Sequence, residues 1–321
     1  MNEELVTVLL ISYNHVNTFE KAIKSVLAQK TNFKFKISVW DDCSSDGTAD
    51  IIKRYAGYPN VNCILRNKNV GGAGNLFEAV KSVDTKYFAI LETDDYWSRD
   101  DKLQIQVDIL ENNPDCSFCA HNTLMDYKEH NFKDLYIKTK TKKFSLPKKI
   151  AHGKYIEPHV SARLYRTSCI DWNEIKGPIL VTYDIASNFY YLTKGNLYYI
   201  DEVMSVYNVS GTGCYSSSSP YEQYYKTANC IYNLNKALDW KYNYMLAGFF
   251  ASRLTLTIFS YLRLRYLTNT QNLENVYKNI LDKFYKDFVV KRKKKCLFRL
   301  ALPLNRHKRL SLELVREKDY A

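Results

Sequence analysis

The 321-residue sequence lacks the marks of an exported or membrane-spanning protein. Its eight cysteines follow no framework spacing, which favours a reducing compartment over a secreted, cross-linked fold. The opening residues, "MNEELVTVLLISYN", carry acids where a signal peptide carries positive charge, and their apolar run is short. The longest apolar segment, residues 244–261, contains Arg253 and several polar residues, which suits a spanning helix poorly. We therefore expect synthesis and residence in the cytoplasm.

Internal repeats and a second CxxC motif are also missing. The single close pair, Cys116 and Cys119 in "PDCSFCAHN", lies in an apolar run. It predicts a buried strand rather than a redox or metal site.

Acids are absent from residues 291–309, which hold nine Lys or Arg, and residues 128–149 hold eight lysines against two acids. The excess of positive charge behind the net charge of +12 is therefore concentrated in these two segments. Apolar residues make up 46% of the chain, enough for a core, so the composition excludes wholesale disorder. The length allows one large α/β domain or a domain with an appendage.

Strand-like and helix-like runs alternate over the first 120 residues. Apolar runs predict strands at 5–12, 34–42, 61–67 and 86–95, and periodic segments predict helices at 18–29, 46–56, 74–83 and from Asp100 to just before Pro114. Repeated strand–helix units imply a mostly parallel sheet with helices on both faces. We then expect a strand at 157–166, a helix, turn and strand within 182–213, and helices at 221–238, 244–262 and 273–289.

Polar residues gather where the first four strands end: Tyr13–Asn14, Asp41–Asp42, residues 67–74 and Glu92–Asp95. The carboxyl ends of parallel strands converge on one rim, where such sheets bind ligands. At this rim a nucleotide sugar would find a ring to stack on its base, a carboxylate for a base N–H and glycines that admit close approach. Hard carboxylate oxygens suit Mg²⁺ or Mn²⁺, which would bridge to a diphosphate and offset the clustered acids.

Each motif alone has a plainer interpretation. "DDCSSDGT" also fits a turn and helix cap, and "ETDD" also fits an exposed loop. "GGAG" lacks the GxGxxG spacing of a dinucleotide site and follows the third strand rather than the first. Their placement on successive strand ends favours a shared site.

Five segments together resemble the family 2 inverting glycosyltransferases, which have a GT-A fold. They are "VTVLLISYNHVNTFEKAIKSVLAQ", "VWDDCSSDGTADII", "NVGGAGN", "ILETDDYWSRDDKLQIQV" and "GNLYYIDEVMSVYNVSGTG", within residues 5–215. The resemblance implies a nucleotide-binding and catalytic GT-A domain at 1–215. The helical patterns and the basic tail predict a helical, basic region at 216–321. It also implies a UDP-sugar donor and a divalent cation, Mn²⁺ or Mg²⁺.

The resemblance also assigns roles to individual residues. Tyr13 corresponds to the base-stacking aromatic, Asp42 to the uracil-binding acid and Asp184 to the catalytic base, for which a helix-cap aspartate is the plain alternative. The other expected donor contacts are Asn14, Asn69, Gly71 and Asp94, the metal ligands Asp95 and Asp94, and the acceptor or active-site contacts Trp97, His159 and Asp46. Two departures stand out: Glu92 replaces the usual first Asp of the acidic motif, and Asn208 and Ser210 stand where many relatives carry Arg and His. His159 is equally a candidate for a structural histidine.

These roles predict a single displacement with inversion, in which Asp184 takes a proton from an acceptor hydroxyl and the metal offsets charge on the departing diphosphate. The basic tail interleaves charge with Leu and Phe, as in segments that lie on anionic membranes. We therefore expect a lipid-linked glycan acceptor, used in assembly of a bacterial surface polysaccharide or glycoprotein glycan, at the inner face of the cytoplasmic membrane.

Several other classes compete. A nucleotide-sugar-binding protein, or a transferase with a soluble or protein acceptor, would share the rim. A pyrophosphorylase would need a basic glycine-rich loop after the first strand, and a glycosidase would need no diphosphate or metal site. A nucleic-acid binder would explain the charge but leave the acidic strand ends unexplained, so no nucleic-acid partner is expected.

Overall fold

The computed structural model describes residues 4–127, 131–146, 156–209 and 218–268. The chain forms two compact units, one containing residues up to 218 together with 230–241, and the other containing 219–229 and the residues from 242 onward. The boundary expected between residues 215 and 216 stays a prediction.

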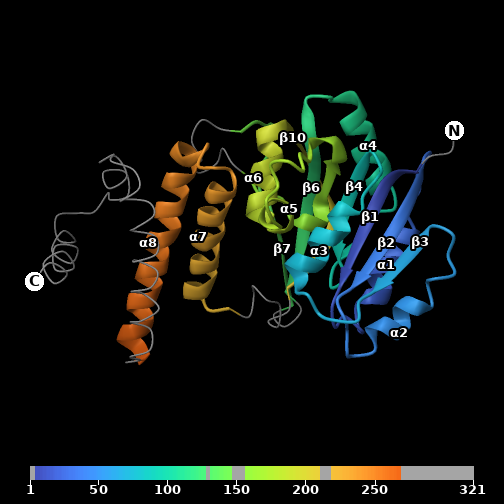
Figure 1. Ribbon diagram of the computed structural model, residues 1–321, viewed down its shortest axis with the longest axis horizontal. Coiled ribbons are helices and arrows are strands. Elements are labelled where there is room, and N and C mark those ends of the chain that lie inside the picture. Colours follow the sequence, from blue (N-terminus) through green and yellow to red (C-terminus); the bar gives the residue numbers. More distant parts are fainter. Residues whose placement is uncertain (1–3, 128–130, 147–155, 210–217, 269–321) are drawn as a thin grey trace, which may run out of the picture. The chain divides into compact units, whose positions relative to one another are not determined.

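The first unit is built on one mixed sheet (Figure 1). Its strands are β1 Glu4–Ser12, β2 Lys34–Asp41, β3 Val61–Leu65, β4 Tyr87–Glu92, β5 Tyr96–Trp97, β6 Cys116–Tyr127, β7 Phe132–Leu135, β8 Lys143–Phe144, β9 Arg163–Arg166 and β10 Asn196–Asn208. They follow the order β3-β2-β1-β4-β9-β6-β10-β5, with β7 paired to β6 and β8 paired to β10. The first four strands are parallel, β9 runs against its neighbours β4 and β6, and β10 is parallel to β6.

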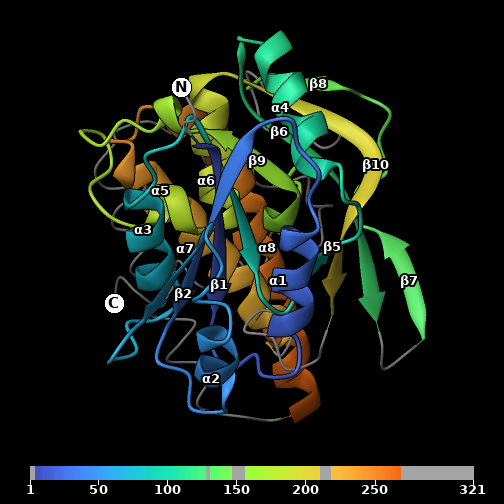
Figure 2. The same ribbon diagram turned by 90° about the vertical axis from the view of Figure 1, so that its right-hand side faces the viewer.

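Helices cover both faces of the sheet, as expected. They are α1 Phe19–Leu27, α2 Thr48–Lys53, α3 Gly72–Lys81, α4 Lys102–Asn112, α5 Ile179–Thr182 and α6 Asp184–Lys194. Figure 2 shows α1 and α4 on one face and α3, α5 and α6 on the other. Alternate side chains of β1 explain the division: Val6, Val8 and Leu10 pack into the core cluster that contains α1 and α4 residues, and the residues between them point to the opposite face.

Two helices follow the sheet, α7 Pro220–Ala237 and α8 Asn243–Thr268, where the apolar patterns predicted them. The third expected helix, at 273–289, and the basic tail, at 291–309, lie outside the described residues. Within the described chain, no helix combines the length and the apolar character needed to cross a bilayer.

The strand expected at 157–166 is only partly present. A 3₁₀ turn occupies Val160–Ala162, and β9 starts at Arg163. Pro158 lacks an N–H for a strand ladder, and the His159 side chain accepts from the Ser161 backbone N–H, which favours a turn. Cys116 and Cys119 lie buried on β6, as predicted.

Candidate active site

The carboxyl ends of the four parallel strands lie level with one another. Ser12 pairs with Asp41, Ile11 with Glu92 and Asp41 with Leu65. The loops that follow these strands therefore open on one rim, which the sequence predicted.

The loops after β1 and β2 hold each other in place. Asn14 adopts a positive φ of 55°, accepts a hydrogen bond from the Ser45 N–H at 2.8 Å and donates its own N–H to Ser44 Oγ at 2.8 Å. The neighbouring Tyr13 ring is 46% exposed, so it presents a face to which a flat base can stack. Asn14 therefore shapes this loop from within.

Asp42 connects the second and third strand ends. Its side chain is buried, and its Oδ1 accepts a hydrogen bond from the Val70 N–H at 2.9 Å. Asn69 Oδ1 accepts from the Gly71 N–H at 2.9 Å, and Gly71 has a φ of 81°, a conformation that favours glycine. The predicted donor residues Asp42, Asn69 and Gly71 therefore lie in one hydrogen-bonded strip.

The acidic motif follows β4. Partial desolvation, then the charges of Asp94 and Asp184, raise the pKa of Glu92, although its side chain keeps contact with solvent. Burial, then the charges of Asp94 and Glu92 and, more weakly, Asp184, raise the pKa of Asp95 well above its usual range. The charge of Asp184, from far along the chain, contributes to both shifts.

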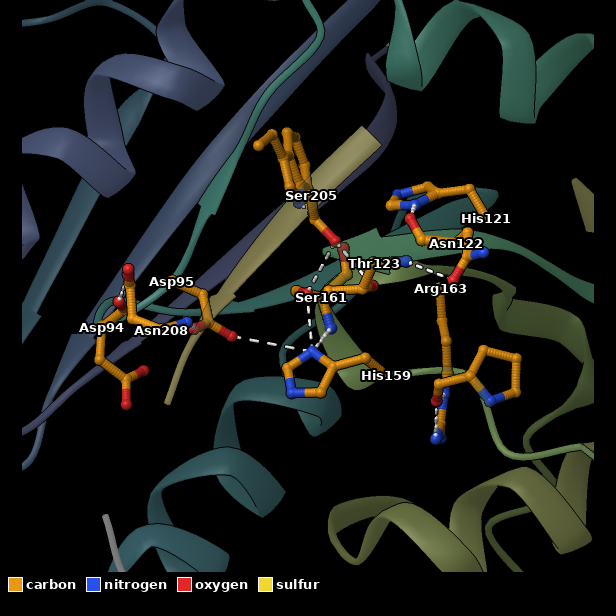
Figure 3. Close-up of polar contacts among 12 residues, drawn as sticks. Asp94, Asp95, His121, Asn122, Thr123, His159, Ser161, Arg163, Ser205 and Asn208 are labelled. Atoms are coloured by element: carbon orange, nitrogen blue, oxygen red, sulfur yellow. Dashed lines mark hydrogen bonds and ion pairs between the residues drawn. The ribbon is translucent and has the colours of Figure 1, made fainter. Parts of the chain in front are cut away.

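Asn208, at the end of β10, ties that strand to the acidic motif. Its N–H donates to Asp95 Oδ1 at 3.0 Å, and its side-chain amide donates to the Asp94 carbonyl. Figure 3 shows the Asp95 carboxylate directed toward His159, while the Asp94 carboxylate points the other way. Asn208, one of the two departures from the family pattern at the end of β10, therefore has a structural role here. The other, Ser210, lies outside the described residues.

Asp94 and Asp95 fit a divalent cation whose remaining ligands come from the phosphates of a bound nucleotide. Asp94 Oδ1 and Asp95 Oδ2 are buried with no hydrogen-bond partner, an arrangement that a cation would relieve. Within the described ranges, no three His, Cys, Asp or Glu side chains form a metal cage. Mg²⁺ is commonly held by one or two carboxylates together with substrate phosphates, so this donor set suits a cation that arrives with a diphosphate.

His159 lies beside the acidic motif as a neutral imidazole. Its Nδ1 is 3.7 Å from Asp95 Oδ2 and 2.8 Å from Ser161 Oγ (Figure 3). Burial lowers the pKa of His159 to about 4, with the charge of Asp184 opposing the shift. A buried chain of hydroxyls continues from Ser161 Oγ to Ser205 Oγ at 3.2 Å. These contacts fix the ring against the acids.

Asp184 begins α6 and is held there by a buried cation that the sequence reasoning missed. Arg163 is fully buried, and its Nη1 donates to the Asp184 carbonyl and to Ser187 Oγ, each at 3.1 Å. Its Nε donates to the Pro158 carbonyl at 2.7 Å. Alternation along a strand would have marked Arg163 as an inward-facing charge, which is the signal that was available.

Two of the expected acceptor contacts have other partners. Trp97 is 3% exposed, its Nε1 donates to the Ser161 carbonyl at 3.0 Å, and Lys102 Nζ lies 3.9 Å from its ring centroid. Asp46 accepts from the Val16 N–H at 2.9 Å and from Thr48; burial opposes these bonds, but they still lower its pKa. Trp97 is therefore enclosed by the protein, whereas Asp46 is exposed and holds the loops after β1 and β2 together; their roles as acceptor contacts stay predictions.

Comparison with known proteins gives the family. Residues 7–168, half of the chain, match the family described as Glycosyl transferase family 2. The chain belongs to glycosyl transferase family 2.

An uncharacterized Mycobacterium tuberculosis protein, Rv1520, is 34% identical over 125 residues, 38% of this chain and 36% of that protein. The Escherichia coli enzyme WfaP, a UDP-Glc:alpha-D-GlcNAc-diphosphoundecaprenol beta-1,3-glucosyltransferase, is 36% identical over 94 residues, 29% of this chain and 37% of that protein. The match therefore spans little more than a third of these relatives' length.

Solved structures share the fold. S. aureus TarS 1-349 in complex with UDP-GlcNAc has a TM-score of 0.63 at 17% identity, covering 88% of this chain and 81% of that chain. Mannosyltransferase PcManGT from Pyrobaculum calidifontis, in complex with GDP-Man and Mn²⁺, has a TM-score of 0.54 at 14% identity, covering 89% and 88%. The GT-A fold expected from the sequence is confirmed.

Proposed function

We propose that this family 2 glycosyltransferase moves a hexose or N-acetylhexosamine from a UDP-sugar to a hydroxyl of a glycan acceptor, with inversion at the anomeric carbon. The observation that carries the proposal is a series of contacts between Asp184 and the acidic motif: Arg163 donates to the Asp184 and Pro158 carbonyls, and His159, next to Pro158, lies 3.7 Å from Asp95 Oδ2 through its Nδ1. These contacts connect Asp184, the proposed base, to the acids expected to face the donor diphosphate. The UDP-GlcNAc complex of TarS supports this donor class.

In this proposal the rim binds the nucleotide. Tyr13 stacks on the uracil, while Asp42 and the loop containing Asn69 and Gly71 surround the base and ribose. Asp42 Oδ1 already accepts the Val70 N–H, so a base N–H would use its remaining acceptor capacity. Asp94 and Asp95 hold the cation, Mn²⁺ or Mg²⁺, which supplies positive charge to the departing diphosphate when bound. The Mn²⁺ complex of PcManGT supports a metal of this kind.

Asp184 acts as the general base. Its exposed side chain at the start of α6 can meet an acceptor hydroxyl, and its backbone is fixed by Arg163. Its carboxylate takes the hydroxyl proton as the oxygen attacks the anomeric carbon. Inversion requires the attack to come from the side opposite the UDP, and the carboxylate therefore has to lie across the sugar from the diphosphate.

A screen of UDP-sugars for slow hydrolysis tests the function, because it requires no acceptor. We expect one UDP-sugar to be turned over, and Asp184→Asn to reduce turnover on the order of a hundredfold or more while UDP affinity is kept. Retained turnover in this variant would remove Asp184 from the role. Hydrolysis of no UDP-sugar, together with absence of UDP binding, would overturn the proposed donor class.

The acceptor is proposed to be lipid-linked, as the printed name of WfaP describes for that enzyme. The basic segment 291–309 would hold the protein at an anionic membrane surface, at roughly 1 kcal/mol for each basic residue near it. Flotation with anionic liposomes tests this, with a chain ending at Phe288 as the comparison. Equal flotation of the two chains would contradict membrane binding by the tail and favour a soluble or protein acceptor.

A further inference from the structure

Three rings contact one another in series beside the acidic motif, and we name them the aromatic column: Tyr207 stacks on His159, and His159 meets Tyr136 edge to face. The His159 and Tyr207 centroids are 4.5 Å apart with planes at 26°, and the His159 and Tyr136 centroids are 5.3 Å apart with planes at 73°. His159 is 7% exposed and Tyr136 is 36% exposed. The middle ring of the column is therefore buried, and the column ends at Tyr136 in a ring that solvent reaches.

One end of the column lies against the acids. Besides the contact between His159 Nδ1 and Asp95 Oδ2, burial and then the charges of Asp95 and Asp94 raise the pKa of Tyr207 to about 12. This end therefore adjoins the place proposed for the cation and diphosphate.

The segment before His159, the middle ring of the column, is fixed beside α6, which begins with Asp184. Asn188 Nδ2 donates to the Ile156 carbonyl at 2.9 Å, and Arg163 joins the Pro158 carbonyl to the Asp184 carbonyl. The segment that leads into His159 is thus attached to α6 on both sides of Glu157.

Tyr136 shares this neighbourhood. Burial, then the charges of Glu157 and Asp184, raise the pKa of its hydroxyl. Its backbone N–H donates to the Thr123 carbonyl at 2.9 Å, which fixes the residue beside β6. Tyr136 is a partly exposed ring in contact with His159, and the segment just before His159 contains Glu157 and is linked through Arg163 to the start of α6. This combination suits a carbohydrate: a ring can cover the C–H face of a pyranose, and carboxylates accept hydrogen bonds from its hydroxyls.

We propose that Tyr136 is the platform on which the acceptor sugar stacks, with its reactive hydroxyl toward Asp184 and a further hydroxyl toward Glu157. This inference rests on the proposed function, since it assigns an acceptor to the same site. The donor base cannot use this platform in the arrangement proposed above, because Tyr13 follows β1 whereas Tyr136 lies beside β6, and β4 and β9 separate those two strands.

Saturation-transfer NMR with methyl glycosides of glucose, galactose and N-acetylglucosamine tests the platform without requiring turnover. The full-length protein with UDP and Mg²⁺ should transfer saturation to the ring C–H protons of at least one glycoside. Tyr136→Phe keeps the ring and should keep the signal, whereas Tyr136→Ala should lose it. Phe132→Ala is the matched control, because Phe132 is a 54% exposed aromatic on the adjoining β7 and should leave the signal unchanged.

Kinetics supply a second readout with the glycoside that binds. Tyr136→Ala should raise the acceptor KM by about two- to tenfold, the usual scale for one aromatic contact, with the UDP dissociation constant unchanged. Equal signals in wild type and Tyr136→Ala would overturn the platform, as would a weaker UDP affinity that accounts for the whole effect. Failure of every glycoside to bind wild type would also overturn it. If glycosides bind in a Tyr136-dependent way but no UDP-sugar is hydrolysed, the platform stands and the proposed donor reaction fails.

Discussion

Arg163 supports a prediction that separates folding from catalysis. The guanidinium is fully buried and donates to the Pro158 and Asp184 carbonyls, Tyr165 Oη and Ser187 Oγ. Arg163→Met would leave the Pro158 and Asp184 carbonyls without these donors, at a cost of about 1–3 kcal/mol each. Part of that cost is offset because a buried charge disappears, so we expect a net loss of about 2–4 kcal/mol. For a protein of 321 residues the loss lowers Tm by roughly 3–6 °C.

Catalysis should suffer beyond the loss of stability, because the start of α6 carries Asp184. A displacement of about 1 Å at a reacting group can reduce turnover by about a hundredfold. We expect Arg163→Met to lower kcat for UDP-sugar turnover by at least about tenfold at temperatures well below its Tm, on the same reasoning. Arg163→Lys, which keeps the charge and can reach one carbonyl, should recover part of the activity.

Arg166 provides the matched control on the same strand. Its guanidinium donates to the Cys116 and Leu110 carbonyls and to Tyr87 Oη, all away from α6. Arg166→Met should therefore lower Tm with little change in kcat. Thermal unfolding and initial rates at one low temperature check both variants. If the two variants lose the same fraction of kcat, Arg163 acts through general stability and does not position Asp184.

Three further predictions follow from single sites. Asp95→Asn should keep the hydrogen bond from Asn208 and remove a buried unpaired charge, so Tm without metal should rise by a few degrees. The stabilisation by Mn²⁺ with UDP should disappear in this variant, and an unchanged metal response would contradict Asp95 as a metal ligand. Burial lowers the pKa of Lys102 to about 7, so between about pH 7 and 10 the unfolded chain binds the extra proton and stability should rise with pH. The pKa shift sets an upper bound of about 5 kcal/mol on this gain in unfolding free energy, and the cation–π contact with Trp97 reduces it by roughly 2 kcal/mol. Lys102→Met should lose the pH dependence in denaturant titrations. A Cβ at Gly195 would meet the Asp115 carbonyl at 2.9 Å, so Gly195→Ala should cost about 1–3 kcal/mol in unfolding free energy, and an unchanged midpoint would show that the backbone relaxes.

The parallel half of the sheet was predictable because each strand and helix there is specified by its own periodicity. Residues 8–11 and 87–91 are continuous apolar runs, as strands covered on both faces require, and polar residues follow each run at the carboxyl end of its strand. The same reasoning missed β5, β7 and β8. These strands are two to four residues long, and β8 lies in a lysine-rich segment whose composition is that of a solvated surface.

The site was predictable to the extent that it is made by strand ends. Tyr13, Asp42 and Asp95 follow strands directly, so their convergence needs only the topology. The burial of Trp97 was not predictable, because an aromatic after an acidic loop has the same sequence pattern whether it faces a ligand or the core; here Lys102 and the Ser161 carbonyl lie against its ring. Tyr136 comes to the site through tertiary pairing, which no local pattern reports.

The central claim is that a cation and a pyrophosphate together occupy the rim at the carboxyl ends of the first four strands. Calorimetric titration of UDP into the full-length protein, with and without Mn²⁺, tests it most directly. We predict binding that is strengthened at least about tenfold by Mn²⁺ in wild type and is insensitive to Mn²⁺ in Asp95→Ala, since a bound cation would add several kcal/mol of charge compensation. Equal UDP affinity with and without Mn²⁺ in the wild-type protein would contradict the account.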